Sequence, residues 1–139
     1  MDDLGYELSK AGAECAKRAV AQVVAAQPTR RCFVAGAIGP TTKTSSVSTD
    51  SNDAAARGTT YPELVQAYGE QVRGLLDGGV DLLLVETIFD TLNAKAAFFA
   101  IQRLFAEGAR QVPIMASVTF IQAGSNRGFS GQTVEGFWN

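Results

Sequence analysis

The sequence contains no histidine, only two cysteines and no long hydrophobic run. Without an imidazole, the chain has no Ser-His-Asp triad, Cys-His pair, H-E-x-x-H zinc helix or histidine general base. Cys15 and Cys32 cannot supply a four-ligand structural zinc site or a disulfide framework, and we expect both to be buried free thiols in a reducing compartment. The N-terminal residues lack the apolar stretch of a signal peptide, and no segment approaches the ~20 apolar residues of a membrane span.

The chain also has little net charge. Twelve Lys and Arg residues stand against 14 Asp and Glu residues, so the formal net charge is −2. This balance gives no electrostatic reason to expect binding to nucleic acid or to an anionic membrane. A hydrophobic share of 46% is that of a folded globular protein, and 139 residues make one modest domain. We therefore expect a soluble cytoplasmic domain that spans residues 1–139.

Apolar residues at helical spacing alternate with short aliphatic runs along the chain. This pattern predicts helices over residues 4–26, 60–78 and 91–108, strands over 32–38, 81–87 and 112–119, and the start of a helix over 132–139. Strands separated by helices indicate parallel strands joined by right-handed crossovers. The expected fold class is α/β, with about three parallel strands alternating with helices. A doubly wound sheet fits, and so does part of a (β/α)8 TIM barrel, which needs about 250 residues in full.

Several positions mark where these elements begin, end and pack. Thr60 and Glu63 match a capping box, and either Asp90 or Thr91 is expected to cap the next helix. The strand over residues 32–38 is almost wholly apolar, which is typical of a strand buried on both faces. In the first helix one apolar stripe is expected to face the core; it consists of Leu4, Leu8, Ala11, Cys15, Ala19 and Val23.

Chemistry is expected at the carboxyl ends of the strands, where both architectures bind their ligands. Glu86 follows a run of four large aliphatic residues. A carboxylate there is costly unless it is paired. Glu86 therefore caps a loop or pairs with an arginine, or it accepts hydrogen bonds from a cationic ligand group such as an α-ammonium. Gly39, Pro40 and Thr41 follow another strand, but without the G-K-[ST] ending of a phosphate loop they predict a tight turn.

The most specific stretch is E-T-I-F-D-T-L-N-A-K-A at residues 86–96. Together with V-A-G-A-I-G-P-T at 34–41, residues 61–68 and S-G-Q-T at 130–133, it resembles the homocysteine-binding domain of cobalamin-dependent methionine synthase. The resemblance implies a (β/α)8 barrel in which a zinc ion, held by three cysteine thiolates, activates the homocysteine thiolate. Methylcobalamin then supplies the methyl group that gives methionine. The resemblance also assigns Glu86 to the homocysteine ammonium, and Gly39, Pro40 and Thr41 to a loop at the same mouth.

The same resemblance implies that residues 1–139 are a fragment of that barrel domain. The zinc cysteines of the family would lie beyond Asn139, and its first strand would lie before Met1. Zinc and methylcobalamin would then belong to a parent protein that also carries folate and cobalamin modules. We expect the fragment alone to bind neither cofactor and to be inactive. A cut barrel should also expose an apolar inner face, expected to include Val34, Leu83 and Val85.

Two other functions remain open at this point. One is a different homocysteine or thiol methyltransferase, such as a betaine-dependent enzyme with the same barrel. The other is a non-catalytic, truncated piece that serves in assembly.

Overall fold

The structure is a computed structural model that describes residues 4–46, 48–120, 124, 126–128 and 131–138. Its elements, in chain order, are α1 (Leu4–Ala26), β1 (Ala35–Ile38), β2 (Ser48–Asp50), β3 (Asp53–Arg57), α2 (Tyr61–Asp77), β4 (Leu82–Ile88), α3 (Thr91–Ala106), β5 (Ile114–Val118) and α4 (Val134–Trp138). None of the helices in the described part of the chain is long and apolar enough to cross a lipid bilayer.

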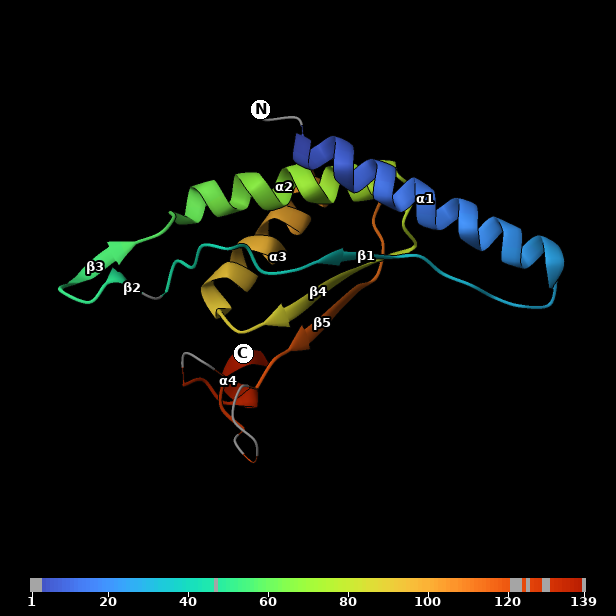
Figure 1. Cartoon of the computed structure of the whole chain (residues 1–139). Helices are drawn as coiled ribbons and strands as arrows, with labels where there is room; N and C mark the ends of the chain where they lie inside the picture. The colour runs from blue at the N-terminus through green and yellow to red at the C-terminus, as the bar shows by residue number, and fades with distance from the viewer. Residues whose placement is uncertain (1–3, 47, 121–123, 125, 129–130, 139) are drawn as a thin grey trace.

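Strands β1, β4 and β5 form one parallel sheet in the order β1-β4-β5, with helices between them in the chain (Figure 1). The prediction of an α/β fold with three parallel strands is confirmed, and this arrangement is that of part of a (β/α)8 barrel. Strands β2 and β3 form a separate antiparallel hairpin inside the long connection after β1. The hairpin was not predicted from the sequence, because its residues are mostly small and polar and show no strand periodicity.

Local capping signals fix the start of two helices. Helix α2 begins at the predicted capping box, in which the Glu63 amide donates to Thr60 Oγ1 at 3.4 Å and the Thr60 amide donates to Glu63 Oε2 at 2.8 Å. Asp90 rather than Thr91 is the N-cap of helix α3, because the Asp90 side chain accepts hydrogen bonds from the amides of Leu92 and Asn93.

Among the described residues, helices cover one face of the sheet. Helices α2 and α3 pack against β1 and β4, and α1 packs on α2 (Figure 1). Leu83 and Val85 are buried under these helices, and Val34 is buried as well. The prediction that these three residues lie on an exposed inner face is therefore wrong. By strand alternation Leu82, Leu84 and Glu86 face the other side, where Met115 is 53% exposed.

Strand β1 is also buried on one face only. Gly36 and Ile38 are buried, whereas Ala35 and Ala37 are exposed. The prediction that this strand is buried on both faces is therefore wrong for the described structure. The strand is also shorter than predicted, since residues 32–34 precede it without forming strand structure.

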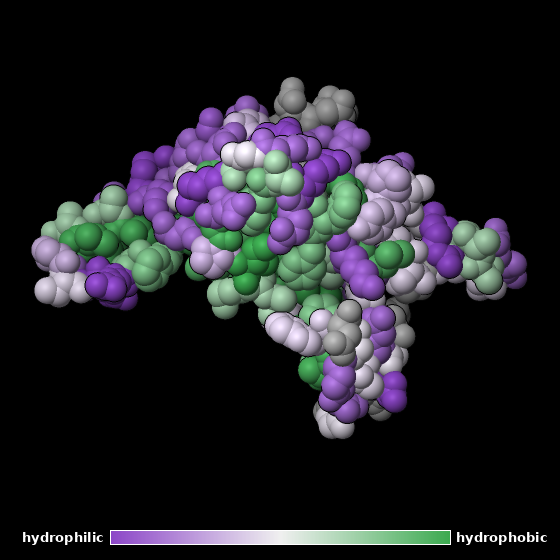
Figure 2. Space-filling model, turned by 180° about the vertical axis from the view of Figure 1, so that it is seen from behind, coloured by the Kyte–Doolittle hydropathy of each residue, from purple (hydrophilic) through white to green (hydrophobic). Residues whose placement is uncertain are grey.

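Helix α1 packs through the face opposite to the one predicted. Ala13 is buried against α2, whereas Leu8 is 64% exposed and Cys15 is exposed, so the expectation that Cys15 is buried is wrong. Cys32 is half-buried. Val23, near the carboxyl end of α1, is 36% exposed. Figure 2 shows apolar surface on the end of α1 that projects beyond the sheet.

Two glycines, Gly74 in α2 and Gly78 directly after it, explain this choice of face. A Cβ atom at Gly74 would collide with the backbone oxygen of Tyr6, and one at Gly78 would collide with the Ala13 side chain. The two helices therefore approach closely through small residues, and a large side chain such as Leu8 does not fit between them. The contact is completed by the Tyr6 hydroxyl, which donates to Asp77 Oδ2 at 2.8 Å.

We predict opposite effects for two matched glycine substitutions. Gly74→Ala should lower the free energy of unfolding by about 1–3 kcal/mol, because the added methyl group separates α1 from α2. Gly12→Ala lies in the interior of α1 with no atom within 4 Å of the new Cβ, so it should stabilise by about 0.5–1 kcal/mol. Urea denaturation followed by circular dichroism measures both. Equal stability changes of the same sign would contradict the proposed packing.

Candidate functional site

The carboxyl end of β4 contains a β-bulge at Glu86 and Thr87. Val85 pairs with Ala116 and Ile88 pairs with Val118, so two residues of β4 lie opposite one residue of β5. Thr87 has a φ of 55°, and among the described residues it is the one non-glycine residue with a positive φ. A β-branched residue rarely adopts this backbone conformation, and such strain is concentrated at functional sites.

Glu86 is half-buried beside this bulge. Within the part of the chain that the structure describes, its carboxylate makes no hydrogen bond and no ion pair. The alternative in which Glu86 caps a loop or pairs with an arginine therefore finds no support among these residues. A carboxylate in this position has its acceptor capacity available to water or to a ligand.

The predicted site residues of the two strands come together because β1 and β4 are parallel neighbours. Gly39 and Pro40, directly after β1, line a small hollow together with Glu86 and with Tyr68 of α2. Burial raises the pKa of the Tyr68 phenol above its usual value, so the phenol remains neutral at physiological pH. The hollow holds about 10 Å³, which suffices for one water molecule. A ligand larger than water would therefore have to approach Glu86 from the open side of the sheet.

Gly39 also leaves space at this edge. A Cβ atom added to it would meet no protein atom within 4 Å, so the mouth next to Gly39 is open. Thr41 differs from its two neighbours, because its hydroxyl group donates to the Lys43 carbonyl oxygen at 2.5 Å and does not line the hollow. Of the predicted residues, Glu86, Gly39 and Pro40 therefore line one hollow, and Thr41 lies in the loop directly after them.

Asn93 is a residue of this region that the sequence did not single out. It lies in the first turn of α3, lines the same hollow and is 2% exposed. Its amide binds the loop that follows Thr41. The available signal was a polar residue on a helix face that is otherwise made of alanine, isoleucine and leucine. Asp90 was predicted as a helix cap alone, but it binds the same loop.

No group of three or more His, Cys, Asp or Glu side chains in the described ranges could hold a metal ion. Cys15 lies in α1, and Cys32 lies before β1, at the end of the sheet opposite Glu86. The residues described here thus do not fit a zinc centre.

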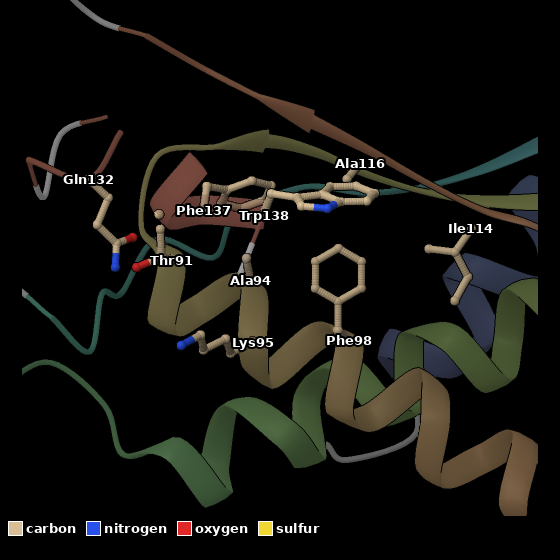
Figure 3. A pocket seen from close by; sticks show the side chains of 10 residues that line it. Thr91, Ala94, Lys95, Phe98, Ile114, Ala116, Gln132, Phe137 and Trp138 are labelled. Carbon is tan, nitrogen blue, oxygen red and sulfur yellow. The ribbon is translucent and has the colours of Figure 1, made fainter. Parts of the chain in front are cut away.

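A larger cavity lies elsewhere and has a different character. It holds about 430 Å³ between α3, β5 and α4, and Figure 3 shows Phe98 pointing toward the Trp138 ring across it. Its polar lining consists of Thr91, Lys95 and Gln132, so it offers no carboxylate or thiol. Because it includes none of the predicted site residues, the strand ends at Glu86 remain the candidate functional site.

Comparison with known protein families gives one finding that bears on this site. A family model described as homocysteine S-methyltransferase matches residues 1–139.

Thr87 allows a test of the strained bulge. We predict that Thr87→Gly raises the free energy of unfolding by up to about 1 kcal/mol, because relief of about 1–3 kcal/mol of backbone strain exceeds the entropy cost of glycine. The matched control is Thr119→Gly, at a residue without a positive φ, which should lower stability by about 1 kcal/mol. Thermal melts measure the stability of both variants. An equal loss of stability in both would show that the Thr87 backbone is not strained.

Proposed function

This chain belongs to the homocysteine S-methyltransferase family, and we propose that it forms part of the homocysteine-binding barrel of a cobalamin-dependent methionine synthase. In this proposal the parent protein transfers a methyl group from methylcobalamin to the sulfur of homocysteine and releases methionine. The family match over the whole chain supports homocysteine as substrate. The E-T-I-F-D-T-L-N-A-K-A run and the S-G-Q-T segment favour methionine synthase over a betaine-dependent relative.

The observation that carries the proposal is the half-buried Glu86 carboxylate, which no other described residue pairs with. The α-ammonium of homocysteine is a cationic donor, and a carboxylate that accepts from it forms a charge-assisted hydrogen bond. The bulge holds Glu86 at the strand end, and Gly39 and Pro40 leave the neighbouring edge open. Glu86 would fix the amino-acid end of the substrate, so that its sulfur points away toward the reacting partner.

The zinc ion of this proposal would be bound by other parts of the parent protein. A free thiol has a pKa near 8.5 and is mostly protonated at neutral pH, and zinc coordination supplies the thiolate. Because no described group of residues fits zinc, this chain would contribute the orientation of the substrate and not its activation. Methylcobalamin and folate would likewise bind to separate modules, and the chain alone would be inactive.

Replacing Glu86 tests its role in the full-length protein that carries this chain. Glu86→Gln keeps the shape of the side chain and removes its charge, so homocysteine should bind about 10- to 150-fold more weakly, a loss of about 1.5–3 kcal/mol. Isothermal titration calorimetry measures the affinity, and the zinc content should not change. Glu107→Gln, at the far end of α3, is the matched control and should bind homocysteine normally. A lowered melting temperature with unchanged affinity for homocysteine would show that Glu86 has a structural role and does not bind the substrate.

A second prediction concerns the metal. The chain comprising residues 1–139 should bind no stoichiometric zinc, because a tetrahedral thiolate site needs at least three protein ligands and the chain has two cysteines and no histidine. Metal analysis of the purified chain by mass spectrometry measures this. One zinc ion per chain, lost in Cys15→Ser or Cys32→Ser, would contradict the prediction.

A further inference from the structure

We propose that Asp90 and Asn93, in the first turn of α3, are positioning residues that hold the loop after β1 (residues 39–46) in place at the mouth beside Glu86. This inference rests on the proposed function, because it assigns the loop to homocysteine binding. The two side chains form one buried latch with this loop, although 44 or more residues separate them from it in the chain.

Asn93 uses its whole amide on the loop. Its Oδ1 atom accepts hydrogen bonds from the Ser45 amide and hydroxyl groups, both at 3.1 Å. Its Nδ2 atom donates to the Lys43 carbonyl oxygen at 2.9 Å and to Thr41 Oγ1 at 3.2 Å. An asparagine amide offers two donors and two acceptor positions, so all four are occupied. This complete pairing at a residue that is 2% exposed fixes the path of the loop at three points.

Asp90 divides its two carboxylate oxygens between helix and loop. Oδ1 accepts from the Leu92 and Asn93 amides at 2.9 and 3.2 Å and so caps α3. Oδ2 accepts from the Ser46 amide at 3.2 Å and from the Ser46 hydroxyl at 2.5 Å. The residue is 3% exposed. Helix capping alone requires one of these oxygens, and the other is committed to the loop.

The latch connects the two sides of the mouth. On one side, Asp90 follows the bulge at Glu86 and Thr87 after only Ile88 and Phe89. On the other side, the latched segment begins at Thr41, directly after Gly39 and Pro40. The bulge at Glu86 and the loop after β1 are thus both connected to the first turn of α3. A loop released from α3 would leave Glu86 in place and remove the opposite wall, so substrate binding would weaken while the fold remained.

Asp90→Asn separates the two tasks of Asp90. Its Oδ1 atom can still cap α3, because asparagine is as good a helix cap as aspartate. The amide nitrogen that replaces Oδ2 cannot accept from Ser46. Asn93→Ala removes the other half of the latch. Asn52→Ala, in the exposed turn between β2 and β3, is the matched control for an asparagine truncation.

The experiment uses the full-length protein that carries this chain and combines hydrogen–deuterium exchange with steady-state kinetics. Asn93→Ala removes the acceptor of the Ser45 amide, and Asp90→Asn removes that of the Ser46 amide, so each amide should exchange at least about tenfold faster in the variant that lacks its acceptor. The KM for homocysteine should rise about tenfold or more with kcat within about twofold, as expected for lost substrate binding. Asp90→Asn should keep the melting temperature, and Asn52→Ala should change none of these quantities.

The other outcomes overturn the inference in distinguishable ways. Unchanged exchange at Ser45 and Ser46 would show that the latch does not hold the loop. Faster exchange with an unchanged KM would show that the latch does not position the mouth, while the proposed function would stand. A wild-type protein that does not bind homocysteine would remove the proposed function and this inference with it, whatever the exchange rates show.

Discussion

The register shift at Glu86 and Thr87 determines the geometry of the strand end on which the site is built. In an unbroken β4, Ile88 would face the same side as Glu86, because side chains alternate. The extra residue turns Ile88 into the core, where it is 4% exposed. Burial of an isoleucine stabilises by about 1.5–3 kcal/mol, and the strained φ of Thr87 costs about 1–3 kcal/mol. The bulge therefore costs the fold little, and it leaves Glu86 on the open side of the sheet.

The sequence predicted those features whose signals are local. The capping box at Thr60, the cap at Asp90 and the three parallel strands depend on residues a few positions apart. The packing face of α1 could not be predicted in this way, because α1 also has apolar residues on its other face, namely Ala13, Ala16 and Val20. The choice between the two faces is made by Gly74 and Gly78, more than 60 residues away from the α1 residues that they contact. The covered face of the sheet was misjudged for a similar reason, since β4 is aliphatic on both sides.

The candidate site, like the fold, was predicted from the sequence only in part. Glu86, Gly39 and Pro40 follow from the rule that ligands bind at the carboxyl ends of parallel strands, and the structure brings them to one hollow. The hydrogen bonds of Asn93 could not be predicted, because its partners lie about 50 residues earlier in a loop without periodic structure. Thr41 illustrates the same limit. Its position in the sequence suggested a role at the mouth, but not that its hydroxyl group bonds to Lys43 and to Asn93 of α3.

The central claim is that the Glu86 carboxylate recognises the ammonium group of homocysteine. The most direct measurement compares the affinities of homocysteine and of 4-mercaptobutanoate, which lacks only that ammonium group, for the full-length protein and its Glu86→Gln variant. We predict that the wild-type protein prefers homocysteine by at least about tenfold, and that the variant loses most of this preference. An equal preference in both proteins would contradict the claim, because the ammonium group would then be recognised by another residue.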